Sequence, residues 1–118
     1  MNQTCPVEAT LALIGGKYKA LILWRLSGGT LRFSQLQKHI PATARMLTLQ
    51  LRELESQNLI TRTVYAEVPP RVEYSMTELG RSLMPILTAM RDWGAEYLRS
   101  QNVEPNCFMM TDCNCDQA

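Results

Sequence analysis

The chain has 118 residues, which is enough for one domain with a modest core and too few for two. Hydrophobic residues make up 46% and charged residues 19%, a balance that excludes an intrinsically disordered chain. No apolar run is long enough to cross a bilayer, and residues 1–4 lack the basic and apolar regions of a signal peptide. We therefore expect a cytoplasmic protein whose four cysteines are mostly reduced.

The net charge of +1 conceals two halves of opposite sign. Residues 1–62 have a net charge of +5, whereas residues 63–118 have a net charge of −4. Such an asymmetry indicates that one half of the chain meets a polyanion, although a solvated basic surface would have the same composition. Charge alone supports these two interpretations of the basic half equally.

Apolar spacing predicts three short helices at the start of the chain. The first begins at Pro6, since proline is favoured in a first turn, and ends at the glycine pair 15–16. A second helix covers residues 17–26, and a third covers residues 33–40 after an extended stretch at residues 30–32. Three apolar residues form the expected buried stripe of the first helix: Val7, Leu11 and Ile14.

A fourth helix is predicted over residues 44–57, because the hydroxyl of Thr43 can accept a backbone N–H of its first turn. At 100° per residue, three leucines lie within roughly 60° of one another and predict the buried face: Leu47, Leu51 and Leu54. The opposite side carries three polar residues and one leucine: Arg45, Leu49, Arg52 and Ser56. Asn58 ends the helix, since asparagine tolerates the left-handed conformation required there.

Two strands follow the basic helices. Residues 61–65 are rich in strand formers, residues 72–76 are apolar at alternate positions, and the loop between them contains Pro69 and Pro70. Two helices separated by residues 41–43 and followed by a hairpin have the order of a winged helix-turn-helix. We therefore expect an α+β fold, mostly helical, with a two- or three-stranded antiparallel hairpin as the wing.

A long final helix begins after Thr77, which can cap it, and Pro85 predicts a kink near residues 81–85. The helix has an apolar residue at every third or fourth position: Leu79, Leu83, Leu87, Met90, Trp93 and Tyr97. An apolar stripe of this kind is more often part of a core or a dimer interface than of a ligand site. The periodicity fades after Arg99. The chain thus divides into one domain, residues 1–100, and a cysteine-containing tail, residues 101–118.

In a winged helix-turn-helix, the helix over residues 44–57 enters the major groove of DNA. Arg45 and Arg52 can bind guanine or phosphate bidentately, and Thr48 can bind a base or a phosphate. Leu49 contacts a thymine methyl group or packs on a neighbouring element, and Arg71 beside the hairpin tip can reach a flanking minor groove or phosphate. The expected DNA contacts are Arg32, Ser34, Lys38, Thr43, Arg45, Met46, Thr48, Leu49, Arg52 and Arg71.

Eight short motifs follow one another along residues 5–95: Cys-Pro-Val-Glu from position 5, Gly-Gly-Lys-Tyr-Lys from 15, Ile-Leu-Trp from 22, Arg-Phe from 32, Arg-Met-Leu-Thr from 45, Leu-Arg-Glu-Leu-Glu from 51, Val-Pro-Pro-Arg-Val-Glu-Tyr from 68 and Trp-Gly from 93. In this order they resemble the HxlR family of winged-helix regulators, relatives of the MarR-like repressors. Tyr18 stands where that family often has tryptophan, Asn58 where it often has glycine, and Leu49 where glutamine is common. The substitution at Leu49 puts the base preference at that position in doubt.

The resemblance implies a homodimer on an inverted-repeat operator, with terminal dimerisation helices and with the helix after Thr43 as the DNA reader. The dimer residues expected on the terminal helices are Val7, Leu11, Leu87, Met90, Trp93 and Tyr97. On this basis we expect a sequence-specific transcription regulator that binds double-stranded DNA and represses a gene.

Cys5 precedes Pro6 at the start of the first helix, where unpaired N–H groups and the helix dipole favour the nucleophilic thiolate. In several regulators of the family that the chain resembles, a cysteine in this context senses oxidants, quinones or aldehydes, and the resemblance implies the hypothesis that Cys5 reacts with a small thiol-reactive effector. The alternative for Cys5 is a purely structural residue.

Three further cysteines, Cys107, Cys113 and Cys115, are separated by five residues and then by one, unlike the ligands of a zinc site. We therefore expect no metal. A disulfide between Cys5 and a tail cysteine of another subunit is favoured over a metal site, and unpaired tail thiols are favoured over both.

The lone histidine, His39, has no second histidine or triad partner that the sequence identifies, and no glycine-rich phosphate loop is present. We therefore expect a protein that is not an enzyme and has no cofactor. Two alternatives to the regulator stay open: a winged-helix protein-interaction module that does not bind DNA, and a small thiol-redox or metal-handling protein.

Overall fold

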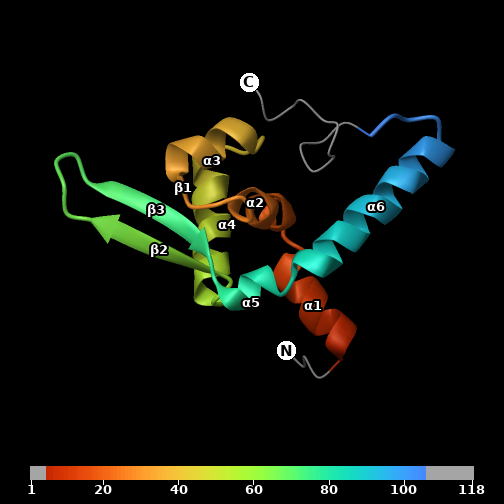
Figure 1. Cartoon of the computed structure of the whole chain (residues 1–118), viewed down its shortest axis with the longest axis horizontal. Helices are drawn as coiled ribbons and strands as arrows, with labels where there is room; N and C mark the ends of the chain where they lie inside the picture. Colours follow the sequence, from red (N-terminus) through yellow and green to blue (C-terminus); the bar gives the residue numbers. More distant parts are fainter. Residues whose placement is uncertain (1–4, 106–118) are drawn as a thin grey trace.

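The computed structural model describes residues 5–105 of the chain. Its elements, in chain order, are α1 (Pro6–Ile14), α2 (Lys19–Leu26), β1 (Leu31–Arg32), α3 (Phe33–His39), α4 (Ala44–Ser56), β2 (Ile60–Tyr65), β3 (Arg71–Met76), α5 (Glu78–Arg81) and α6 (Met84–Ser100). The hairpin of β2 and β3 projects to one side of the helices, and α6 extends away on the other side (Figure 1). This arrangement confirms the expected α+β, mostly helical fold.

The sheet has three antiparallel strands in the order β1-β3-β2. Leu31 and Arg32 pair with Tyr74 and Glu73, so the short stretch before α3 forms the third strand. The sequence had left two or three strands open, because a pair of residues is too short to show a period. The pairing of β1 fixes the start of α3 against the base of the hairpin.

The core consists of aliphatic side chains from five helices and β2, together with Tyr74 of β3. Each fully buried side chain of this kind stabilises the fold by about 1.5–3 kcal/mol. The largest of them are Ile22, Leu23, Leu26, Leu36, Ile40, Leu47, Leu51, Leu54, Leu59, Ile60 and Leu87. Because α4 supplies three leucines to this core, its predicted buried face is confirmed.

The caps predicted from threonine and asparagine are present. Thr43 Oγ1 accepts a hydrogen bond from the Met46 amide at 3.1 Å, and Asn58 has a φ of 63° just after α4. Thr77 Oγ1 accepts from the Gly80 amide at 3.0 Å and donates to the Asn58 carbonyl oxygen at 2.6 Å. The end of α4 and the start of α5 are therefore joined through one hydroxyl group.

The predicted long final helix is two helices. Because α5 ends at Arg81 and α6 begins at Met84, Pro85 lies in the first turn of a new helix and does not kink an existing one. Leu87 is 1% exposed, so it belongs to the core of the protomer, and its expected place in the dimer interface is wrong. Leu79, predicted in the same apolar stripe, is exposed on α5.

The first helix also differs from its prediction. Only Ile14 of its apolar stripe is buried, while Val7 is 66% exposed and Leu11 is 56% exposed. The spacing correctly placed these residues on one face, but α1 lies at the side of the domain and other described elements cover only its C-terminal end (Figure 1). Val7 and Leu11 thus remain available for the interface in which they were expected.

A polar cluster of buried Lys19, buried Gln50 and exposed Glu53 joins α2 to α4. Lys19 is 4% exposed, and its Nζ lies 2.9 Å from Glu53 Oε2 on α4. Buried Gln50 on α4 points its Oε1 toward Gly16, where a Cβ would lie only 2.5 Å from that oxygen. A side chain at Gly16 would therefore displace the ends of the Gln50 and Lys19 side chains, so this glycine lies in close contact with the cluster as well as ending α1.

Replacing Glu53 with alanine should lower the free energy of unfolding by about 1–3 kcal/mol, because the buried Lys19 ammonium group would lose its ion-pair partner. Urea denaturation followed by circular dichroism measures the change. The double variant Lys19→Met/Glu53→Ala should recover most of the loss, since it removes the buried charge as well. A double variant no more stable than Glu53→Ala would show that the ion pair is not the cause.

Candidate nucleic-acid interface

The side of α4 that faces away from the core is basic. Arg45 and Arg52 are exposed there, and neither forms an ion pair with any residue between positions 5 and 105. Leu49 and Met46 are also exposed on this helix. The structure thus brings two cations and two apolar side chains to one surface, which can meet both phosphates and base edges.

The two threonines of this region already hydrogen-bond within α4. Thr43 accepts from Met46, which leaves its hydroxyl hydrogen available to a phosphate oxygen. Thr48 Oγ1 donates to the Ala44 carbonyl oxygen at 2.8 Å. In this rotamer Thr48 can accept but not donate, so it suits a base amino group better than a phosphate.

The expected phosphate contacts on α3 are exposed. Arg32 is the N-cap residue of α3, and its amide donates to Gln35 Oε1 at 2.9 Å. Ser34 follows in the first turn and Lys38 lies in the last turn. Arg32 and Ser34 also line a hollow of about 530 Å³ between α3 and the hairpin loop. These residues lie on, or at the start of, the helix that precedes α4 in the chain.

Arg71 at the start of β3 is restrained in a way that the sequence did not reveal. Its Nη2 lies 3.2 Å from Glu67 Oε2, its Nε lies 3.5 Å from Glu73 Oε2, and its guanidinium group lies 4.2 Å from the centre of the Tyr65 ring. Two carboxylates therefore compensate this charge. A phosphate would compete with these two carboxylates for the Arg71 guanidinium group.

Arg62 was missed by the sequence reasoning. It is an exposed residue of β2 whose cross-strand partner is Tyr74, and it lines a hollow next to α4 together with Arg52. The signal was present, since Arg62 belongs to the basic half and lies in a predicted strand. What the sequence lacked was the strand register, which decides the face that carries Arg62.

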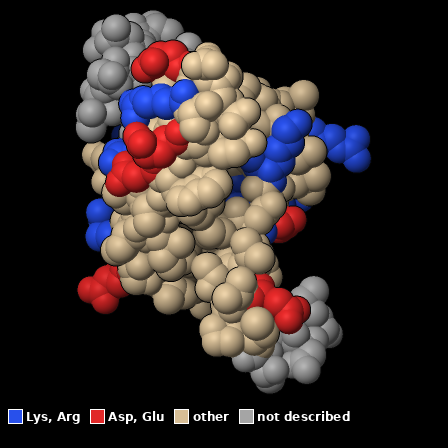
Figure 2. Space-filling view, turned by 90° about the vertical axis from the view of Figure 1, so that its right-hand side faces the viewer, with Lys and Arg blue, Asp and Glu red and all other residues tan. Residues whose placement is uncertain are grey.

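An apolar surface lies on the side that carries α1 and α6. Figure 2 shows a continuous band of uncharged residues on this side, between groups of charged ones. Its exposed large apolar side chains are Val7, Leu11, Ile86, Met90, Trp93 and Tyr97. A groove of about 310 Å³ lies between the two helices and is lined by both. All the residues expected in the dimer interface except Leu87 are exposed on this surface, two on α1 and three on α6.

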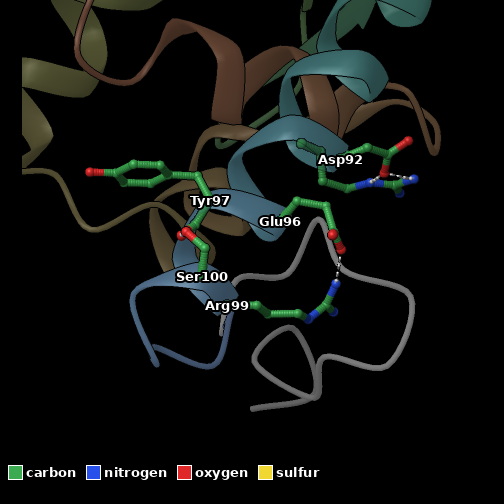
Figure 3. A network of polar contacts seen from close by, with 6 residues as sticks. Asp92, Glu96, Tyr97, Arg99 and Ser100 are labelled. Carbon is green, nitrogen blue, oxygen red and sulfur yellow. Dashed lines mark hydrogen bonds and ion pairs between the residues drawn. The ribbon is translucent and has the colours of Figure 1, made fainter.

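The charged and aromatic residues of α6 are segregated. Arg91 Nη2 lies 2.9 Å from Asp92 Oδ1, and Arg99 Nη1 lies 3.2 Å from Glu96 Oε1. Tyr97 points away from these ion pairs (Figure 3), and its ring stacks on Trp93 with centroids 5.6 Å apart. The helix therefore has one charged side and one aromatic side.

Cys5 is exposed and is the N-cap residue of α1. Cys107, Cys113 and Cys115 lie outside the described residues, so the predictions made for them are not addressed by the structure. Within residues 5–105 no group of three or more His, Cys, Asp or Glu side chains could hold a metal ion. In the same range no helix combines the length and apolar character needed to span a membrane.

A helix held in the core by leucines, with arginines on its outer side, a preceding helix and a following antiparallel hairpin define a winged helix-turn-helix of the DNA-binding class. The chain belongs to the HxlR-like helix-turn-helix family, whose model matches residues 13–102. The family predicted from the eight motifs is thereby confirmed.

Relatives and solved structures agree on a helix-turn-helix regulator. YdeP of Bacillus subtilis (strain 168), an uncharacterised HTH-type transcriptional regulator, is 55% identical over 94 residues, 79% of this chain and 73% of YdeP. The redox regulator HypR in its oxidised form has a TM-score of 0.72 at 52% identity, covering 76% of this chain and 94% of that one. The reduced form of the transcriptional regulator YodB from B. subtilis has a TM-score of 0.70 at 32% identity, covering 80% and 95%. The protein is a transcriptional regulator of the HTH type.

Proposed function

We propose that the protein is a homodimeric repressor that binds an inverted-repeat operator with α4 of each protomer in the major groove. The observation that carries the proposal is the pair Arg45 and Arg52, exposed without ion-pair partners among the described residues on a helix anchored by buried leucines. The guanidinium groups of such a helix can bind guanine or phosphate. The buried leucines on its opposite face fix the position of the helix relative to the rest of the domain.

The remaining expected contacts take roles that follow from their position. Arg32, Ser34 and Lys38 on α3, together with Thr43 before α4, would bind backbone phosphates. Met46, Thr48 and Leu49 would lie in the groove beside the arginines, with Leu49 against a thymine methyl group. Arg71 would join them by exchanging Glu67 or Glu73 for a phosphate.

The apolar surface of α1 and α6 supports the dimer. A second copy of the chain would cover Val7 and Leu11 on α1 and Met90, Trp93 and Tyr97 on α6. These side chains are large and mutually close, and exposed apolar patches of this kind mark interaction sites. A twofold axis through this surface would present two α4 helices to successive major grooves.

Selection of genomic fragments by the purified protein, followed by fluorescence anisotropy at increasing salt, tests the proposal. We expect an inverted repeat whose half-sites lie about 10 base pairs apart or a multiple of that, with affinity that falls steeply as salt rises. The rival protein-interaction module would select no duplex over random fragments. Placing the operator upstream of a reporter gene then separates repression from activation.

The exposed thiol of Cys5 supports a second function, redox control of operator binding. Cys5 lies at the start of α1, the helix that carries part of the proposed dimer surface. Two similar proteins were solved as a redox regulator in its oxidised form and as a regulator after diamide treatment. In the proposed step, Cys5 and a tail cysteine of the second subunit form a disulfide while diamide takes up two electrons and two protons.

Treatment with diamide should lower operator affinity by about tenfold or more in the native protein and leave Cys5→Ser unchanged, because the disulfide would shift the subunits. Anisotropy measures the affinity, and non-reducing electrophoresis with mass spectrometry identifies the linked cysteines. A variant with the three tail cysteines changed to serine tests the assigned partner. If fully oxidised protein binds the operator as well as reduced protein does, Cys5 is not a sensor.

A further inference from the structure

We propose that the hollow between α4 and the base of the hairpin is the seat of one backbone phosphate of the bound duplex, held by Arg52 and Arg62. The proposal rests on the DNA binding proposed above and adds Arg62, a strand residue, to the contacts made by the helices. It also assigns Arg52, which could bind either guanine or phosphate, to phosphate. We call this hollow the phosphate seat.

The phosphate seat has a volume of about 240 Å³ and is built from one helix and two strands. Its lining residues are Thr48, Leu51, Arg52, Glu55, Arg62 and Tyr74. Those on α4 lie along one flank of the helix, between its buried face at Leu51 and its exposed face at Arg52. Buried Leu51 and Tyr74 contribute the apolar part of the lining, and the charged residues lie around them.

The strand register explains why Arg62 reaches this place. Arg62 is directly paired with Tyr74 across β2 and β3, and paired residues project to the same face of a sheet. Tyr74 is only 8% exposed because its face of the sheet packs on the core. Arg62 therefore projects on the face that meets α4, whereas its neighbours Thr61 and Thr63 project to the other face.

The charges of the phosphate seat match a single phosphate group. Neither Arg52 nor Arg62 forms an ion pair within the described part of the chain. Glu55 is the one carboxylate among the lining residues, so the hollow retains a net positive charge. Two guanidinium groups present forked donors that fit the oxygens of a phosphate.

The position of the phosphate seat favours a duplex as the source of that phosphate. With α4 in the major groove and the hairpin directed at the adjacent minor groove, one DNA strand must pass over the junction of α4 with β2. In Figure 1 the base of the hairpin lies directly beside α4, which is where this strand would cross. Binding of the duplex would therefore place a backbone phosphate next to Arg52 and Arg62.

Replacing Arg62 with glutamine tests the proposal. We expect affinity to fall about tenfold or more, by the same factor for operator and for unrelated duplex, because a phosphate carries no sequence information. The slope of log K against log salt should shrink by about 0.9 for each protomer, or about 1.8 for a dimer. Arg99→Gln is the matched control: it removes one positive charge at the far end of α6 and should change neither quantity.

Two further measurements locate the contact. Replacing Glu55 with glutamine should raise affinity by about two- to fivefold, since a carboxylate beside the phosphate repels it. A duplex with one neutral methylphosphonate is then scanned along the strand between the two grooves. At the phosphate that occupies the seat, this change should weaken the native protein about tenfold and Arg62→Gln by no more than twofold.

Each other outcome overturns the proposal. An unchanged affinity and salt slope in Arg62→Gln, with the circular dichroism spectrum intact, would show that Arg62 meets no phosphate. Loss of affinity for the operator alone would make Arg62 a base contact. Binding of inorganic phosphate at millimolar concentration with no methylphosphonate effect would make the hollow a site for a small free anion. Absence of any salt-dependent duplex binding by the native protein would instead reject the proposed function itself.

Discussion

Replacing Arg45 and Arg52 together with alanine should weaken operator binding about ten-thousandfold or more. Each lost guanidinium contact costs about 1.5–3 kcal/mol, and a dimer would lose four of them. Both side chains are exposed, so the free energy of unfolding should change by no more than about 0.5 kcal/mol. Anisotropy with the selected operator measures the first effect, and urea denaturation measures the second.

The single variants separate the roles of the two arginines. Arg45→Ala should reduce the preference for operator over random duplex, whereas Arg52→Ala should weaken both by a similar factor if Arg52 binds phosphate. A double variant at Arg81 and Arg99 removes the same charge from the acidic half of the chain and should bind normally. Undiminished operator binding by the Arg45/Arg52 double variant would show that α4 is not the reading helix.

Replacing Trp93 with glutamate should convert the protein to monomers and lower operator affinity by about a hundredfold or more. Trp93 is 71% exposed in the protomer and stacks on Tyr97, so a charge there would be buried against the second copy without a partner. Sedimentation velocity measures the mass, and circular dichroism establishes that the monomer remains folded. The loss of affinity follows because a single protomer contacts only one half-site.

Arg99→Gln is again the matched control for Trp93→Glu, since it makes the same change in net charge on the charged side of the same helix. This variant should remain dimeric and bind the operator with native affinity. A Trp93→Glu protein that sediments as the native protein does would place the dimer surface elsewhere.

The features of α4 could be predicted because they depend on local rules. A threonine that caps, leucines at helical spacing and an asparagine with positive φ each act within a few residues of their own position, and Thr43 and Asn58 are found as predicted. The reading face of the candidate site follows from the same periodicity, since residues opposite the buried leucines must face outward. That includes Arg45 and Arg52.

The remaining features depend on contacts between segments that are distant in the sequence. Periodicity placed Val7 and Leu87 in apolar stripes but could not say what covers each stripe, and one proved exposed and the other buried. The ion pairs of Arg71 depend on how the hairpin loop closes. The location of Arg62 depends on its register against Tyr74, which no residue near Arg62 determines.

The hydroxyl of Thr77 has a mechanical consequence. Because it donates to the Asn58 carbonyl and accepts from the Gly80 amide, it links the turn that follows α4 to the segment that leads into α6. In a symmetric dimer, the contacts that connect α4 of one subunit to α4 of the other would include the Thr77 hydroxyl of each subunit. These two hydroxyl groups would therefore help to set the distance between the two α4 helices. The range of spacer lengths between half-sites that the protein can bind would then depend on the two hydrogen bonds of the Thr77 hydroxyl as well as on the rigidity of the helices.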